Sequence, residues 1–408
     1  MSQETLRGVR ATLVGALGLS VFVVGAADAA DYRFEPRVEL GGMYNDNYRL
    51  APDNEDSVQG GLADVSLRLR SVTPTSDFNL TPRVRATYFP DDSEDDDVNE
   101  YVNLGFAHKA QTWRFGLEGY YSHEDLQTSE QPEADQPPDA GLGGGVGVEN
   151  GTVRVKNSRD LIRLAPSVSF DLTPTKAVEA ALEYYSADYS RDTVGSNTDF
   201  DSIAGSLGMS FRFSPTQRIL IAATGTSFDP DTPLTGRSTS YGLKGELWTD
   251  RTEIMQTYLR IGAERTEEDD PEIGEAPDPT TNYVLGAGIK AQYQVTAIFA
   301  DFTHGVRPNA SGVLVTRDDL RVQVRREFTP TVSGFVGVLG ANDEAANDDG
   351  EFRDRRYYAG SAGLQWRFTP AFSLVGAYDY RRQKRDQEGT GVSNQVVLSI
   401  VWDPPRRQ

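Results

Sequence analysis

Cysteine is absent from this 408-residue chain, which excludes disulfides and a lipoprotein anchored through an N-terminal cysteine. Long apolar runs are also scarce. After the first 29 residues, no stretch reaches the roughly 18 consecutive apolar residues of a membrane-spanning helix. Mean hydropathy is −0.49, and hydrophobic residues make up 38% of the chain. A bundle of membrane helices is therefore excluded.

Positive charge and histidine are in short supply as well. The chain has 40 Lys and Arg against 61 Asp and Glu, and its net charge of −21 excludes duplex nucleic acid as a partner. The three histidines are His108, His123 and His304. The run His123-Glu124-Asp125 places a base beside carboxylates, but no nucleophile accompanies it. We expect a solvated loop end there, no enzyme activity and no cofactor.

The N-terminus has the pattern of a secretory signal peptide. Arg7 and Arg10 precede an apolar segment at 11–26, and Ala-Asp-Ala at 27–29 fits a cleavage site between small residues. A membrane anchor is the alternative, but the apolar segment is short and no positive flank follows it. We therefore predict that residues 1–29 are cleaved.

Turn signals with a Ser/Thr-Pro or similar core recur along the chain, several of them about 40 residues apart. They lie at 72–77, 108–113, 172–177, 213–218, 248–253, 290–295, 328–333 and 368–373. Longer acidic, Asn-, Gly- and Pro-rich stretches alternate with them, at 45–59, 90–98, 123–157, 188–198, 229–238, 265–280, 305–316, 342–355 and 383–391. The segments between are roughly 10–13 residues long and alternate apolar with polar residues, which predicts β-strands.

Alternating short turns and long loops between amphipathic strands are typical of an outer-membrane β-barrel. The pattern predicts an all-β, transmembrane antiparallel barrel of about 18 strands, with 16 as the alternative, spanning residues 30–402. Residues 403–408 would form a periplasmic tail, and both termini would be periplasmic. A soluble sandwich or propeller is the alternative fold, but its loops do not alternate so strictly.

Aromatic residues near the short turns and the C-terminus predict a girdle at the periplasmic membrane interface. These residues are Phe78, Trp113, Phe170, Phe213, Trp248, Tyr293, Phe328, Trp366 and Trp402.

If the apolar residues face lipid, a set of basic residues near the short turns faces the lumen: Arg70, Arg83, Arg212, Lys290, Arg325 and Arg367. Such a ring at the periplasmic mouth would draw in an anionic polymer or solute. The alternative is that these side chains pair with lumen carboxylates such as Asp64, Asp379 and Glu264 and only fill the interior.

The predicted extracellular loops carry acidic runs at 91–97, 267–278 and 342–351. None has the spacing of a calcium loop, so we expect a solvated acidic surface and no metal site. Weak divalent binding that bridges to lipopolysaccharide phosphates is the alternative. The glycine-rich stretch 141–151 lies within the longest loop, 123–157, and would be either an exposed loop or a segment folded into the lumen.

The end of the first predicted strand, Tyr44-Asn45-Asp46-Asn47 followed by "YRLAP", resembles the start of a family of β-barrel porins. That family is associated with exopolysaccharide and capsule export in Gram-negative bacteria. The resemblance implies a pore that secretes an exopolysaccharide or other anionic polymer together with a periplasmic export partner. One departure is the C-terminus: Trp402 is followed by "DPPRRQ" (403–408), whereas many outer-membrane barrels end on an aromatic residue.

Two further functions stay open from the sequence. The barrel could be a general or anion-selective diffusion porin for small solutes, or a plugged structural or adhesive surface protein. In each case the predicted surroundings are outer-membrane lipids and lipopolysaccharide.

Overall fold

In a computed structural model of the protein, the described residues are 31–53, 57–90, 96–126, 157–190, 197–232, 236–252, 254–269, 278–346, 354–386 and 389–405. The predicted signal peptide and the glycine-rich stretch 141–151 lie outside them, as do most of the 123–157 loop and parts of each acidic run. No helix in the described part of the chain is long and apolar enough to cross a membrane.

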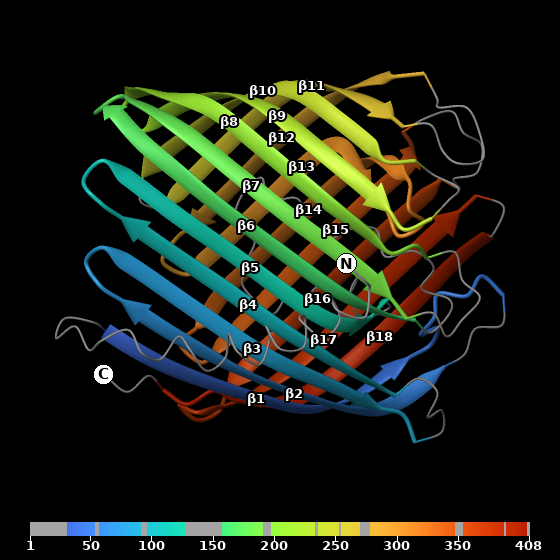
Figure 1. Ribbon diagram of the computed structural model, residues 1–408. Coiled ribbons are helices and arrows are strands. Elements are labelled where there is room, and N and C mark those ends of the chain that lie inside the picture. Colours follow the sequence, from blue (N-terminus) through green and yellow to red (C-terminus); the bar gives the residue numbers. More distant parts are fainter. Residues whose placement is uncertain are drawn as a thin grey trace, which may run out of the picture.

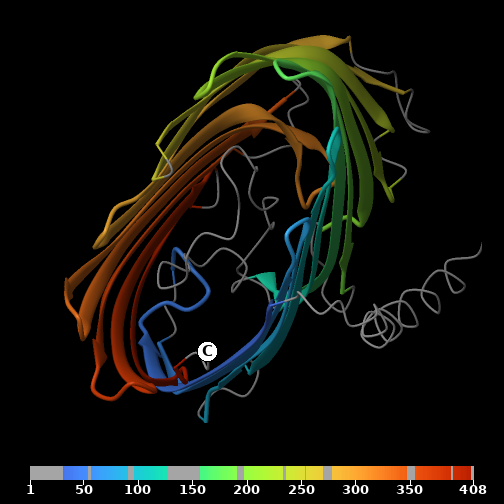
Figure 2. The same cartoon turned by 90° about the vertical axis from the view of Figure 1, so that its left-hand side faces the viewer.

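Eighteen antiparallel strands form one sheet that closes on itself, because each strand pairs with its neighbours in sequence and β1 pairs with β18 (Figure 1). This confirms the predicted 18-strand barrel. Viewed obliquely, the barrel has an elongated cross-section (Figure 2). The strands are β1 (Asp31–Asn45), β2 (Val58–Val72), β3 (Ser76–Tyr88), β4 (Asp97–Lys109), β5 (Trp113–Asp125), β6 (Ser158–Thr173), β7 (Lys176–Tyr189), β8 (Phe200–Ser214), β9 (Gln217–Pro230), β10 (Ser238–Thr252), β11 (Met255–Glu268), β12 (Thr280–Gln292), β13 (Thr296–Pro308), β14 (Leu314–Thr329), β15 (Val332–Ala345), β16 (Arg355–Arg367), β17 (Phe372–Arg385) and β18 (Gly389–Trp402).

The strands are longer than the sequence pattern predicts. β6 and β14 each have 16 residues, and the β13–β14 connection shrinks to 309–313 where a break over 305–316 was expected. Likewise, the predicted break at 383–391 reduces to 386–388. The reason is that backbone pairing continues past the point where apolar residues give way to charged ones. Composition marks the end of the lipid-facing band rather than the end of the strand.

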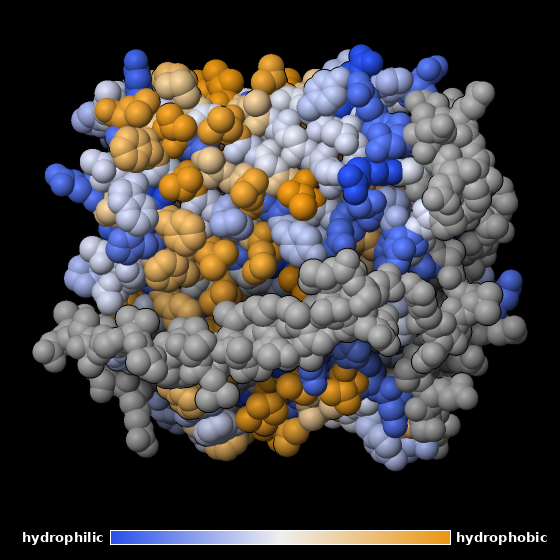
Figure 3. All heavy atoms as spheres, viewed as in Figure 1, coloured by the Kyte–Doolittle hydropathy of each residue, from blue (hydrophilic) through white to orange (hydrophobic). Residues whose placement is uncertain are grey.

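The outer face of the barrel carries the apolar residues. Leu243, Ile261 and Tyr283 are 66%, 66% and 67% exposed, which suits side chains that contact lipid rather than water. Figure 3 shows apolar side chains gathered over the half of this face nearer to the short turns, with hydrophilic ones toward the long loops. The strands therefore project beyond the lipid on the loop side.

Aromatic residues mark both edges of the apolar band. At the short-turn end, Trp113, Phe170 and Trp366 are exposed on the outer face, as the girdle prediction requires. At the loop end the aromatics on the outer face are tyrosines, and two of them donate hydrogen bonds from their hydroxyls to carboxylates: Tyr184 to Asp201 and Tyr241 to Glu267, both at 2.8 Å.

Trp248 corrects one member of the predicted girdle, because it faces the lumen. It packs against Tyr258 and Phe299, and its indole N–H donates to Glu246 at 3.0 Å. β10 runs on to Thr252 with a register shift between Asp250 and Thr252. A residue close to a turn has a known height along the barrel, but its face is set by its odd or even position in the strand, because successive side chains point to opposite faces.

The lipid-facing position of Ile261 makes a stability prediction. We expect Ile261→Arg to lower the free energy of unfolding by roughly 2–4 kcal/mol, because a guanidinium would be placed in the hydrocarbon layer. Denaturant titration of the refolded barrel in lipid vesicles measures this. The control is Thr224→Arg, whose side chain faces the lumen. An equal loss in both variants would contradict the assignment of faces.

Candidate functional site

The inward face of the barrel is predominantly polar and charged, and all six basic residues predicted for the lumen lie on it. Arg70 pairs with Asp77 at 2.5 Å and Arg83 with Asp64 at 2.6 Å. Arg325 donates to the Gln365 side chain at 2.7 Å.

The other three, Arg212, Lys290 and Arg367, are exposed toward the lumen, and none of them forms an ion pair with another described residue. The expectation that these basic groups only pair with lumen carboxylates therefore holds for Arg70 with Asp77 and Arg83 with Asp64, and not for the whole set.

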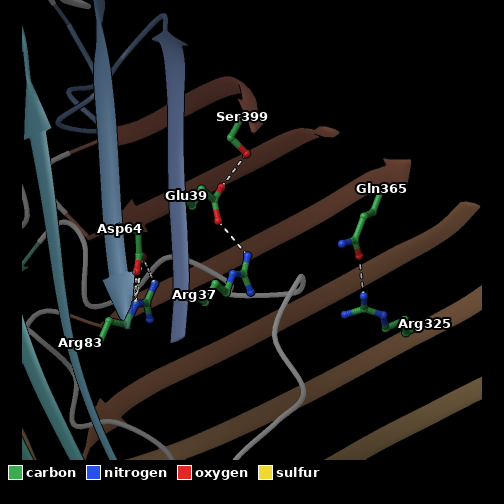
Figure 4. Close-up of polar contacts among 7 residues, drawn as sticks. All are labelled: Arg37, Glu39, Asp64, Arg83, Arg325, Gln365 and Ser399. Atoms are coloured by element: carbon green, nitrogen blue, oxygen red, sulfur yellow. Dashed lines mark hydrogen bonds and ion pairs between the residues drawn. The ribbon is translucent and has the colours of Figure 1, made fainter. Parts of the chain in front are cut away.

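Figure 4 shows how these contacts sit on facing walls. Arg83 and Asp64 project from β3 and β2, and Arg325 projects from β14 toward Gln365 of β16. On β1, Arg37 pairs with Glu39 at 2.8 Å, and Glu39 accepts a hydrogen bond from a serine of β18. Guanidinium groups from more than one wall thus point into the same interior space.

A second group of arginines, on β13–β17, was not singled out from the sequence. Asp343, fully buried, lies 3.5 Å from both Arg317 and Arg355, and Arg317 also lies 3.3 Å from Asp319. The Arg355 guanidinium stacks over the Tyr357 ring at 5.0 Å. The available signal was polar or charged residues at alternate positions, with arginine at every fourth residue, in "RDDLRVQVRR" (317–326) and "YRRQKR" (380–385). This signal falls partly in stretches assigned to loops.

Positive charge exceeds negative charge on this wall. The inward positions of β13–β17 hold the arginines Arg307, Arg317, Arg321, Arg325, Arg355, Arg367, Arg381 and Arg385, against the carboxylates Asp301, Asp319, Glu327, Asp343 and Asp379. The chain as a whole has a net charge of −21, so its acidic excess lies elsewhere. One wall of the lumen is basic within an acidic protein.

The first long loop folds into the barrel where its residues are described. Tyr48 and Leu50 are only 3% and 2% exposed. Tyr48 packs with Phe89 in one cluster, and Leu50 packs with Tyr357 in another, on the far side of β17 and β18. Figure 2 shows this segment, in blue, inside the ring of strands. Burial raises the pKa of Tyr48 to about 12, so its phenol stays neutral at ordinary pH.

Hydrogen bonds from the asparagines of this loop hold it in place. The Asn47 side chain accepts from the backbone N–H of Ala51 at 2.9 Å and donates to the carbonyl oxygen of the same residue at 2.8 Å. The carbonyl oxygen of Tyr48 accepts from the Arg381 guanidinium at 3.3 Å. These bonds close the segment 46–51 into a compact turn tied to the basic wall.

The residues just before this turn join β1 to β18. Asn45 bonds to Gln395 at 3.2 Å and to Ser393 at 2.9 Å, and Asp46 accepts two hydrogen bonds from Asn394 at 2.7 Å. Tyr44-Asn45-Asp46-Asn47 therefore closes the barrel seam and turns the chain inward.

The three histidines lie on three different strands, β4, β5 and β13, and each contacts a Ser or Asp of an adjacent strand. His108 bonds to Ser76 at 2.8 Å at the short-turn end. His123 and His304 lie on the outer face, 2.9 Å and 2.8 Å from aspartates of the adjacent strands. Glu124 points instead into the lumen and pairs with a buried arginine at 2.7 Å, so the run His123-Glu124-Asp125 is split between two faces. No group of three or more His, Asp or Glu within the described ranges is placed to hold a metal ion.

Together, the closed sheet, the apolar outer band and the charged interior define a transmembrane β-barrel of the outer-membrane type. No protein-family model matches the chain, and no curated protein sequence matches it.

Solved structures with a similar arrangement include porins. The chain is 11% identical to Pseudomonas aeruginosa OccK2 (OpdF) in complex with glucuronate, with 91% of this chain and 98% of that chain covered and a TM-score of 0.42. It is 9% identical to a BenF-like porin from Pseudomonas fluorescens Pf-5, with coverage of 91% and 99% and a TM-score of 0.45. At such values the likeness concerns barrel architecture alone.

Proposed function

We propose that the protein is an outer-membrane diffusion channel that prefers small anionic solutes, with both termini in the periplasm. The observation that carries this proposal is the arginine-rich inward face of β13–β17. Arginine keeps its charge at all physiological pH values, and its planar guanidinium suits carboxylates and phosphates. A basic wall inside a low-dielectric barrel raises the local concentration of anions.

The inward position of residues 46–51 favours small solutes over a polymer. Tyr48 and Leu50 occupy space inside the barrel near its loop end, and hydrogen bonds tie them to the basic wall. A polysaccharide chain would have to displace these buried side chains. The near-literal part of the resemblance that implies polymer secretion is confined to 44–52, and residues 44–47 close the barrel seam. We therefore favour the small-solute channel and include no export partner in the proposal.

The proposed surroundings follow from the outer face. Lipid would cover the apolar band, and lipopolysaccharide would contact the tyrosine-rich rim toward the long loops. A plugged surface barrel is the competing function, and it depends on residues 127–156, outside the described part of the chain.

Reversal potentials in planar bilayers under a salt gradient test the selectivity. We expect Arg321→Gln, Arg325→Gln and Arg367→Gln, combined in one variant, to shift the reversal potential toward zero. Each charge would contribute about 1 kcal/mol at roughly 15 Å and an effective dielectric constant near 20, so the ratio of anion to cation permeability should fall by on the order of tenfold or more.

A matched control removes the same charge from the outer face. Arg326, Arg356 and Arg382 lie on β14, β16 and β17 and are exposed on the outer surface. Their combined substitution with Gln should leave the reversal potential unchanged. Identical potentials in the wild type and the lumen variant would reject anion selectivity, and no current from folded protein would support the plugged barrel.

A further inference from the structure

The pairing between β12 and β13 stops before either strand ends. It runs from Gln292 opposite Ala297 to Leu285 opposite His304, although β12 begins at Thr280 and β13 continues to Pro308. By contrast, β13 stays paired with β14 up to Pro308. We call residues 305–313 the β13–β14 tip. Its β13 residues pair with β14 on one side but do not pair with β12 on the other side.

The β13–β14 tip turns into the barrel instead. The Glu264 carboxylate of β11 accepts a hydrogen bond from the Val306 backbone N–H. This bond joins β13 directly to β11, although β12 lies between them in the sheet. The Ala310 carbonyl oxygen accepts from the Thr198 backbone N–H at 2.7 Å, and Ala310 is fully buried in a cluster with Phe228. These contacts dock the tip against segments from the opposite side of the loop end.

Docking carries Arg307 into the lumen. Its guanidinium lies 3.5 Å from the Thr303 hydroxyl. It interacts electrostatically most strongly with Arg317 and Asp319 of the adjacent β14. It also interacts with Glu183 of β7 and Arg260 of β11. In the ring of strands, five others separate β7 from β13. Arg307 therefore reaches charges on the other wall because the β13–β14 tip leans inward.

Two glycines suit a segment that moves. A Cβ added at Gly305 would have no neighbouring atom within 4 Å. The backbone at the base of the tip therefore has free space around it. Gly312 has a φ of +76°, and a Cβ there would lie 2.8 Å from the Thr198 methyl carbon, so docking requires glycine at this position.

We propose that the β13–β14 tip is a hinged gate that sets the width and the charge of the pore by carrying Arg307 into the lumen. In the alternative state, the register of β12 and β13 continues to the strand ends, which brings Tyr283 opposite Val306 and withdraws Arg307 toward the wall. In that state, the backbone pairs gained between β12 and β13 offset the loss of the contacts that dock the tip inside the barrel. The effect on conduction rests on the proposed channel function, whereas the hinge motion does not.

Disulfide trapping reads the hinge directly, because the chain has no cysteine of its own. In the docked state Tyr283 and Val306 are not paired, so a Tyr283→Cys, Val306→Cys variant can cross-link only when the ladder closes. The control is Ala287→Cys, Phe302→Cys, a pair already in register on the same outer face. If the open state is populated at roughly 1–10%, the test pair should cross-link to completion about 10–100 times more slowly than the control.

The cross-linked channel should show a higher unitary conductance that returns to the starting value on reduction. Absence of cross-linking over a time in which the control pair is complete would overturn the hinge. Full cross-linking with unchanged conductance in an active channel would overturn the role of the tip as a gate. A barrel that cross-links fully but never conducts, reduced or oxidised, would reject the channel function and leave the hinge in place.

A cysteine-free variant protects the test against misfolding of the double mutant. Gly312→Val should undock the tip by collision with Thr198 and raise the unitary conductance. Gly305→Ala, placed in open space, should leave conductance unchanged. Equal conductance in the two variants would overturn the proposal.

Discussion

Replacing Asp343 with asparagine is expected to lower the free energy of unfolding by about 3–5 kcal/mol. Asp343 is fully buried between Arg317 and Arg355, which are themselves 7% and 0% exposed. Asparagine keeps the shape but removes the charge, so two buried guanidinium groups lose their shared counter-ion. Breaking a buried ion pair from one side is costly because the remaining charges stay buried with less compensation, although Arg317 keeps Asp319 and Arg355 keeps its hydrogen bond to Gln383. Denaturant titration of the refolded barrel measures the loss.

Asp318→Asn is the matched control for this prediction. Asp318 lies on β14, on the outer face, and its carboxylate pairs with His304 at 2.8 Å while the side chain remains 45% exposed. An exposed pair of this kind contributes roughly 0–1 kcal/mol. If Asp343→Asn cost no more than Asp318→Asn, the buried network would not stabilise the barrel.

The double variant Asp343→Asn, Arg355→Gln adds a second check. Removing Arg355 together with the Asp343 carboxylate takes away one of the two buried guanidinium charges that lost this counter-ion, so part of the lost stability should return. A further loss equal to the sum of the two single changes would show that the residues act independently.

The barrel itself could be predicted because the two features that define its strands and turns can be recognised in short stretches of sequence. Apolar residues alternate along each strand, as in "SIAGSLGMSFRF" (202–213), and Pro with Ser or Thr marks the tight turns. Closure then follows, since an open edge in lipid would leave backbone groups without partners. Strand ends were predicted less well, because polar strands above the membrane have the composition of loops.

The interior could be predicted only in part. Parity along the strand places Arg70, Arg83 and Arg325 in the lumen, but it does not identify their partners on nearby strands. Asp343 lay within an acidic run that suggested a solvated loop, yet it is buried between arginines of two other strands. Such pairing depends on the register between neighbouring strands, here β14, β15 and β16, and composition does not report register.

The inward turn at 46–51 shows the same limit. Its asparagines signal a turn, but not a turn directed into the barrel. That direction depends on Arg381, which is 333 residues away from the carbonyl oxygen of Tyr48 that it binds. It depends also on the space left by glycine at 391, where β18 passes closest to the segment.

Gly391→Ala is therefore expected to expel this segment from the barrel. A Cβ at position 391 would lie 1.9 Å from the Leu50 carbonyl oxygen and 2.5 Å from its carbonyl carbon, and both are backbone atoms that cannot rotate away. Leu50 has a φ of 52°, so its backbone conformation is already an unfavourable one for a residue with a side chain. Exposing Leu50 and Tyr48 should cost roughly 3–6 kcal/mol, at about 1.5–3 kcal/mol for each side chain.

Two further readouts separate displacement of the segment from general destabilisation. Arg49 lies between the two buried side chains, so trypsin should cleave after it in the variant and spare it in the wild type. Unitary conductance should rise because the lumen is wider at its loop end. Gly376→Ala is the matched control, since a Cβ there comes no closer than 3.9 Å to its nearest neighbour, and it should change neither property.

The combination of results locates the narrowest point of the lumen. Cleavage at Arg49 together with a larger conductance would place the constriction at residues 46–51, next to the basic wall that holds them through Arg381. Cleavage without a change in conductance would mean that the segment lines the lumen but does not limit it. The β13–β14 tip, which carries Arg307 across the same end of the barrel, would then be the limiting element, and Gly312→Val should have the larger effect on current.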